Sequence, residues 1–156
     1  MKIYTSKCSF TVKLITIGII VSMGMLIFSI SALNDNYGTL SAIILSVIIL
    51  VALIYFYANS LNKIIVSEKH LTLKKPFSKI EIPLSDLIRI ERLEFSNLSM
   101  TSGSQGIFGY IGNTMDGSIC MVKDRKKMIR IITKEKNYTI SSEKPADLIN
   151  YLKNVS

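Results

Sequence analysis

Two long runs of apolar residues dominate the N-terminal part of the chain. The first run covers residues 14–33 and the second covers residues 40–57, and neither contains a charged residue. At about 1.5 Å of helical rise per residue, each run reaches roughly the 30 Å thickness of the hydrocarbon core of a bilayer. A segment that is apolar on every side suits a helix, which satisfies its own backbone hydrogen bonds in lipid. The pattern predicts two membrane-spanning helices joined as a hairpin by residues 34–39.

Basic residues around the two runs predict the orientation of this hairpin. The connection contains no lysine or arginine, whereas lysines lie before the first run and after the second, at positions 2, 7, 13, 63, 69, 74 and 75. Because lysine and arginine favour the cytoplasmic side of a membrane, we expect both termini in the cytoplasm. The alternative is a secretory signal that ends near Ala32, although its apolar run is longer than usual and a second run follows at once.

Beyond residue 60 apolar positions alternate with polar ones, which is typical of strands that bury one face. We expect strands near residues 63–66, 70–74, 79–82, 88–93, 119–122, 128–133 and 137–141. Residues 96–118 are expected to form a loop with a short irregular strand around 107–111. The first three make an antiparallel meander, and the strands at 119–122 and 128–133 are expected to form a hairpin. Pro145 then suits the first turn of a helix, with Leu148, Ile149, Leu152 and Val155 on its apolar face.

These elements predict an α+β chain in two parts. Residues 1–60 form an N-terminal tail and the transmembrane hairpin, and residues 61–156 form one small cytoplasmic domain. We expect this domain to hold six or seven antiparallel strands in a bent sandwich or barrel, capped by the C-terminal helix. The chain is 49% hydrophobic, and the two apolar runs supply most of the excess over an ordinary soluble protein.

The net charge of +8 narrows the choice of partners. A basic domain tethered to a membrane is attracted to anionic headgroups. Nucleic acid is not expected, because the chain has no helix-turn-helix pattern, no zinc-ligand spacing and no basic residues interleaved with aromatic ones. Cys8 and Cys120 lie far apart in the sequence, and a reducing cytoplasm would keep both as thiols.

Three stretches carry a resemblance to a known family: residues 82–90 (IPLSDLIRI), residues 106–112 (GIFGYIG) and residues 138–149 (YTISSEKPADLI). In these stretches the chain resembles bacterial pleckstrin-homology (PH-like) domains, in their membrane-anchored form with an N-terminal helical hairpin. The resemblance covers nearly the whole chain and implies the fold described above, at the inner membrane of the cell. It implies a binding module that self-associates in some members, and it supports a fold more than a function.

Glycines at positions 103, 106, 109 and 112 recur every third residue around two aromatic residues. The spacing does not match a dinucleotide fingerprint or a phosphate-binding loop, which ends in Gly-Lys-Ser/Thr. We interpret Gly106, Phe108, Gly109, Tyr110 and Gly112 as a candidate partner-binding loop. The alternative is a bulged edge segment in which glycine permits close backbone approach and the aromatic residues pack within the domain.

A basic run, Lys123, Arg125, Lys126 and Lys127, falls in the predicted hairpin between strands 119–122 and 128–133. Side chains at a hairpin tip project freely, so these residues are the candidate contact with anionic lipid headgroups. Each contributes about 1 kcal/mol near an anionic surface. A solvated turn that keeps an edge strand from aggregating is the alternative.

The sequence offers little for catalysis. Its only histidine, His70, falls in a predicted strand, and we find neither a glycine-flanked serine elbow nor a closely spaced acidic cluster. Asp86, Glu91 and Glu94 alternate with arginines, which is typical of a paired solvent-facing surface. We therefore expect no enzyme, no cofactor and no metal site.

The sequence thus predicts a non-enzymatic, membrane-anchored module that presents a protein- or peptide-binding surface at the cytoplasmic face. The expected surface is an open sheet edge beside the last helix, where an extended peptide or a second copy of the chain can add as a strand. One alternative is an anionic-lipid sensor that uses the basic run. Another is an accessory subunit of a membrane complex, with Ser22, Gly24 and Ser29 packed against partner helices.

Overall fold

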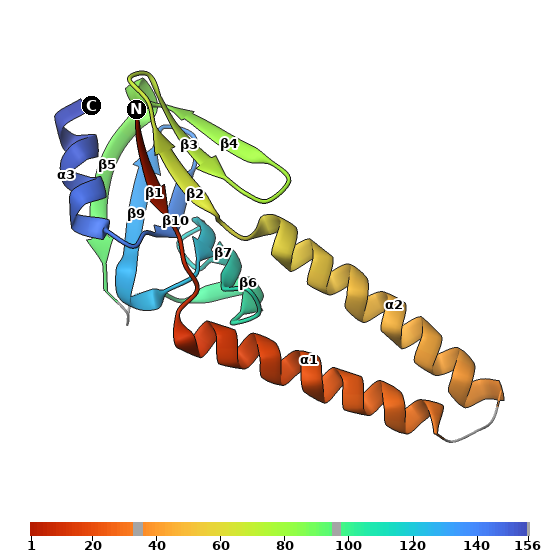
Figure 1. Ribbon diagram of the computed structural model, residues 1–156. Coiled ribbons are helices and arrows are strands. Elements are labelled where there is room, and N and C mark those ends of the chain that lie inside the picture. The colour runs from red at the N-terminus through yellow and green to blue at the C-terminus, as the bar shows by residue number, and fades with distance from the viewer. Residues whose placement is uncertain (33–35, 95–97, 156) are drawn as a thin grey trace.

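A helical hairpin projects from a domain of two sheets in the computed structural model (Figure 1). The structure describes residues 1–32, 36–94 and 98–155, so Leu33 of the first predicted run and Asn34 and Asp35 of the predicted connection lie outside it. Helix α1 (Phe10–Ser31) begins where the Ser9 side chain accepts a hydrogen bond from the backbone of Val12. Helix α2 (Asn36–Asn59) runs back beside α1 to the domain.

The first sheet contains one strand that the sequence pattern did not predict. Its order is β1 (Lys2–Thr5), β2 (Lys63–Val66), β3 (His70–Lys74) and β4 (Lys79–Pro83), with every pair antiparallel. The predicted meander of β2, β3 and β4 is present, and β1 adds to its edge along β2. The segment before α1 therefore shares a sheet with the segment after α2, and both helices leave the domain from neighbouring strands.

The second sheet has six strands in the order β5-β9-β10-β8-β7-β6. These are β5 (Leu87–Leu93), β6 (Met100–Gln105), β7 (Tyr110–Thr114), β8 (Ile119–Val122), β9 (Met128–Thr133) and β10 (Asn137–Ser141). All neighbours in this sheet are antiparallel except β8 and β10, which are parallel. The edges of the sheet, among the described residues, are β5 and β6.

The link between β8 and β9 is not a hairpin, which corrects the prediction. Strand β10 lies between them, so residues 123–127 pass from one side of β10 to the other. At the usual spacing between strands this crossing covers about 10 Å. A short 3₁₀ turn, η3 (Arg125–Lys127), forms within the link, and another, η1 (Leu84–Asp86), joins β4 to β5.

The glycine-containing region forms a hairpin whose pairing is irregular between Met100 and Ser102, where the sequence predicts a loop with a single irregular strand at 107–111. Strands β6 and β7 pair from Met100 opposite Thr114 to Gln105 opposite Tyr110. Residues 96 and 97 of the predicted loop lie outside the described residues. The strand pattern is weak here because glycine, serine and threonine take the places of larger β-forming residues.

Both sheets bury one face in a common core, and helix α3 (Pro145–Val155) closes it. Leu73 and Ile131 from the two sheets, and Leu148 and Leu152 from α3, are 0% exposed. The helix lies against β5 and β9. The predicted α+β class with two N-terminal helices and a C-terminal helix is confirmed, and the two sheets form an open sandwich that does not close into a barrel.

Candidate functional site

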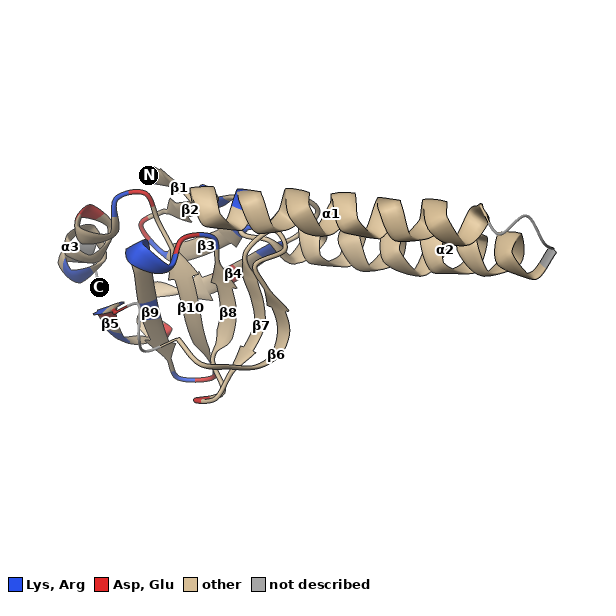
Figure 2. Cartoon of the chain, turned by 90° about the horizontal axis from the view of Figure 1, so that it is seen from below, with Lys and Arg blue, Asp and Glu red and all other residues tan. Residues whose placement is uncertain are grey.

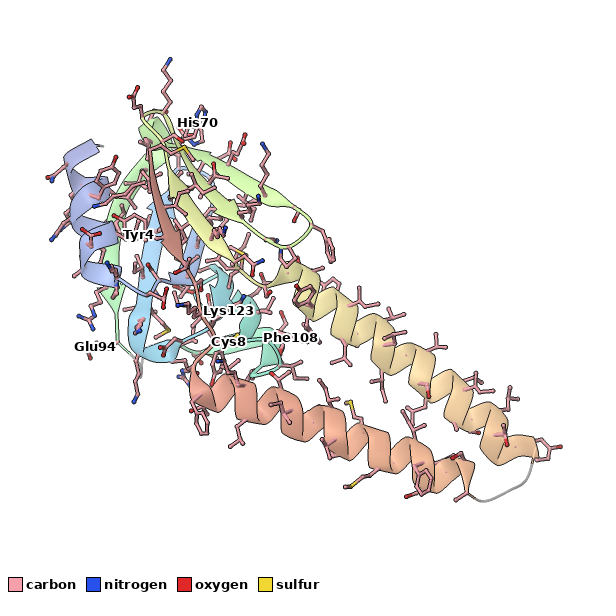
Figure 3. The ribbon with its side chains drawn as sticks, viewed as in Figure 1. Tyr4, Cys8, His70, Glu94, Phe108 and Lys123 are labelled. Carbon is pink, nitrogen blue, oxygen red and sulfur yellow. The ribbon has the colours of Figure 1, made fainter. Side chains whose placement is uncertain are left out.

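The tip of the β6–β7 hairpin lies where the two long helices meet the domain. Its four-residue turn is closed by a hydrogen bond from Gly106 N–H to Gly109 O at 2.9 Å. The buried hydroxyl of Thr16, in α1, accepts a hydrogen bond from Phe108 N–H at 3.0 Å, and its single proton is shared between Val12 O of the same helix, at 2.8 Å, and Gly106 O, at 3.2 Å. The Phe108 ring packs edge-on against Tyr57 of α2, with centroids 5.5 Å apart. The turn therefore touches both helices, as Figure 3 shows at the Phe108 label.

Two glycines of this hairpin are required by close backbone approach. Gly103 and Gly112 face each other across β6 and β7, both with positive φ. A Cβ atom on Gly103 would lie 2.0 Å from Ile111 O, and one on Gly112 would lie 2.1 Å from Ser102 O. Real side chains do not fit at these distances, so the strands approach each other this closely only because both residues are glycine.

The residues of the candidate partner-binding loop thus have contacts within the chain. Gly106 and Gly109 are buried, and Gly106 lies against the Ile15 side chain of α1. The guanidinium of Arg125 lies over the Tyr110 ring, 5.1 Å from its centroid. These contacts fit the close-packing alternative that the sequence left open, and binding of a partner at this loop stays a prediction.

The structure separates the four residues of the basic run. Lys123 is 8% exposed, and its amine donates to Asn62 Oδ1 at 3.1 Å, so this side chain does not project freely as we had expected. Arg125 is half-buried and donates to Leu98 O at 3.2 Å. Lys126 is exposed and Lys127 half-buried. The segment lies beside the first turn of α1, because Ser9 N–H bonds to Lys123 O.

Burial shifts the pKa values of two side chains in this part of the domain, Lys123 and Cys120. It lowers the pKa of the Lys123 amine, because the charged form loses hydration. It raises the pKa of the Cys120 thiol to about 12, and this side chain is 0% exposed. Cys120 is therefore a packed thiol rather than a reactive one.

A groove runs along the outer side of β5, next to α3. Its volume is about 700 Å³, and its walls include Ile88, Arg89 and Arg92 of β5 with Ile149 and Lys153 of α3. Ile88 is 63% exposed, at an irregularity in the pairing of β5 with β9. Strand β5 and helix α3, which line the groove, lie at the end of the domain away from the two long helices (Figures 1 and 2).

The groove carries net positive charge. Arg89 forms an ion pair with Glu91 at 2.9 Å, and Glu91 also lies 3.7 Å from Arg130. Within the described part of the chain, Arg92 and Lys153 have no ion-pair or hydrogen-bond partner. Their charges are exposed to whatever enters the groove.

The sequence pattern predicted an open edge beside the last helix without naming the residues that line it. Ile149 and Lys153 are four positions apart in α3, so they lie on one side of the helix. The alternation in β5 was interpreted as a paired surface, which is correct for Arg89 and Glu91. Two features of the sequence could have indicated a basic groove: the four-residue spacing of Ile149 and Lys153 in the predicted helix, and the arginines of the strand that became β5.

Catalytic and metal chemistry finds no support in the described ranges. Among them, no group of three or more histidine, cysteine, aspartate or glutamate side chains lies close enough to hold a metal ion. His70 is exposed at the start of β3, at the end of the sheet away from the helices (Figure 3).

The family model described as Bacterial PH domain matches residues 62–156. The chain therefore belongs to the bacterial PH domain family, whose members are generally non-catalytic binding modules. Searches of curated proteins and of solved structures found no match. Two helices, Phe10–Ser31 and Tyr37–Asn59, are long and apolar enough to cross a membrane, and only 6% of the apolar window of each is buried.

Proposed function

We propose that this chain is a membrane-anchored, non-enzymatic binding module that holds an extended, acidic segment of a protein in the groove between β5 and α3. The hairpin of α1 and α2 spans the inner membrane, and the PH domain lies in the cytoplasm. The observation that carries the proposal is the open edge of β5 beside α3, with Arg92 and Lys153 unpaired in the groove.

The pairing of β1 with β2 supports the hairpin arrangement. Because β1 precedes α1 and β2 follows α2, the two ends of the hairpin lie on the same side of any membrane that it crosses. Lysines cluster on that side, and the positive-inside rule then places it in the cytoplasm. A cleaved signal would remove β1 from the sheet, which weighs against that alternative.

The shape of the groove supports an extended ligand. An edge strand presents unpaired backbone N–H and C=O groups, and a peptide that adds as a strand satisfies them. Exposed Ile88 offers an apolar contact, while Arg92 and Lys153 favour acidic side chains. Strand β5 and helix α3, which line the groove, lie at the end of the domain opposite the long helices, so a partner would reach it from the aqueous side.

Lipid sensing by the basic segment is the second candidate. It is favoured by one contact, the hydrogen bond from Ser9 N–H to Lys123 O, which holds the segment beside the first turn of α1. Exposed Lys126, with Arg125 and Lys127 next to it, would then face the headgroups, and Lys123 would contribute through its backbone alone.

Site-specific photocrosslinking tests the peptide-binding proposal. A benzoyl-phenylalanine placed at Ile88 in the full chain, in its native cells, is expected to give one discrete protein adduct. The same group at Met115, which is 73% exposed on the turn after β7, is the control. The double substitution Arg92→Glu and Lys153→Glu should abolish the adduct at position 88 without changing the amount of protein in the membrane.

The outcomes separate the candidates. An adduct of twice the mass of the chain would assign the edge to self-association. An adduct that survives the charge reversal, or that forms equally at position 115, would contradict the proposed groove.

A further inference from the structure

Three lysines lie side by side across the end of the first sheet that adjoins α2. Lys63 is directly opposite Lys74, and Lys74 is directly opposite Lys79. All three lysines are exposed. Of the three, only Lys79 has an ion-pair partner within the described residues, Glu81, at 2.6 Å. Like charges directly opposite each other destabilise strand pairing. An anionic surface against this lysine row offsets the repulsion.

An exposed phenylalanine lies at the tip of the adjoining β3–β4 hairpin. The tip is a four-residue turn closed by a hydrogen bond from Lys75 N–H to Ser78 O at 2.8 Å, with Pro76 and Phe77 at its centre. Phe77 is 75% exposed. A large apolar ring at the end of a turn, flanked by lysines on both strands, is the pattern of a segment that meets a lipid surface.

Contacts with α2 place this tip at the level where the apolar run ends. The Phe77 ring packs edge-on against Tyr57, the last residue of the second apolar run, with centroids 6.1 Å apart. The Lys75 amine donates to Asn59 Oδ1, in the last turn of α2, at 3.1 Å. Apart from Lys13, the described residues of both long helices carry no charge (Figure 2). The boundary between hydrocarbon and headgroups therefore falls beside the tip.

We propose that the β3–β4 tip is a lipid-binding site: Phe77 inserts into the bilayer interface, and Lys63, Lys74 and Lys79 bind anionic headgroups above it. This site is separate from the β5–α3 groove and from the basic segment at 123–127. It fixes the domain against the membrane on the side of α2, with the groove turned to the cytoplasm. Removal of each lysine should lower the affinity for anionic headgroups about fivefold.

The chain contains no tryptophan, so a tryptophan introduced at one position reports on that position alone. The substitution Phe77→Trp in the full chain, reconstituted into vesicles, gives a single fluorophore at the tip. Met115→Trp is the matched control, because Met115 is 73% exposed on the turn that follows the last residue of β7. Vesicles contain phosphatidylcholine with a fixed share of phosphatidylglycerol, and the bromine quencher is carried on one lipid or on the other.

We expect blue-shifted emission at position 77, quenching by both brominated lipids, and stronger quenching by the brominated phosphatidylglycerol. The added substitutions Lys63→Gln, Lys74→Gln and Lys79→Gln should remove the preference for phosphatidylglycerol, while protection of the buried Cys120 thiol verifies that this variant is folded. Emission and quenching equal to those at position 115 would overturn the insertion of Phe77. Equal quenching by the two lipids, or a preference that persists without the lysines, would overturn the headgroup site.

Discussion

The β6–β7 turn with Lys123, next to the long helices, and the edge strand β5, away from them, differ in where their polar groups find partners. At the near end, the backbone of the 106–109 turn bonds to Thr16 of α1, and Lys123 bonds to Asn62. At the far end, the outer edge of β5 has no strand beside it within the described residues, and Arg92 has no partner there. Contacts within the chain thus hold the 106–109 turn to α1, whereas the edge of β5 is the surface proposed above to hold a ligand.

A glycine-rich or basic segment in the sequence therefore does not mark a binding surface by itself. Gly106 and Gly112 serve close packing, and the most buried lysine of the basic run is held inside the domain. The groove that is open for binding is lined by ordinary strand and helix positions, such as Arg92 and Lys153. Four substitutions test the contrast between these two regions. In each, thermal unfolding of the full chain is compared with that of the unaltered protein.

The largest effect is expected at the close contact between β6 and β7. Gly112→Ala places a Cβ atom 2.1 Å from Ser102 O, so the strands must separate, and we expect a loss of about 4 kcal/mol or more of stability. Gly117→Ala is the matched control, because its φ is also positive but nothing lies within 4 Å of the added atom. It should cost about 1 kcal/mol. Equal effects would show that the strands are not in close contact.

The hydrogen bonds between α1 and the turn should give the next largest effect. Thr16→Val leaves Phe108 N–H and Gly106 O without their partner, and buried unsatisfied groups cost about 1–3 kcal/mol. Ser22→Ala is the control, because Ser22 is exposed and bonds only to Ile19 O in its own helix. A melting temperature unchanged by Thr16→Val would mean that the turn is not fixed to α1.

The buried lysine predicts a smaller, pH-dependent effect. Because burial lowers the pKa of Lys123 below 10.5, the unfolded chain binds more protons between the two pKa values, and this residue makes stability rise with pH in that window. Lys123→Met should remove this rise and change stability at neutral pH by about 1 kcal/mol or less. Lys126→Met, at an exposed position, should leave the pH profile intact. A profile that is the same in all three proteins would place Lys123 at the surface.

The smallest effect is expected at the open end. Arg92→Ala should change stability by less than about 0.5 kcal/mol, because the side chain is exposed and has no partner in the described structure. Thermal unfolding beside the unaltered chain provides the measurement. A loss as large as that of Thr16→Val would mean that the groove is closed by contacts within the chain.

Local patterns predicted the elements that local physics determines. The apolar runs gave α1 and α2, the alternation around Leu71 and Leu73 gave the meander, and the spacing of Leu148 and Leu152 gave α3. β1 escaped prediction because its partner, β2, follows only after both long helices, so no local pattern marks the pairing. It is a strand because β2 lies beside it.

Long-range pairing decided the rest. The parallel pairing of β10 with β8 turned an expected hairpin into a crossing, and burial of Lys123 depends on Asn62, a residue 61 positions away in the sequence. The sequence analysis placed an open edge beside the last helix, but the groove depends on how β5 and α3 pack. Periodicity along one segment carries no information about such neighbours.

Amide hydrogen exchange of the full chain in lipid nanodiscs tests the contrast between the two ends most directly. We predict slow exchange at Phe108, whose N–H bonds to Thr16, and fast exchange at those amides of β5 that point away from β9. Fast exchange at Phe108 would contradict the attachment of the 106–109 turn to α1. Slow exchange along both sides of β5 in the unliganded chain would contradict the open edge of this strand.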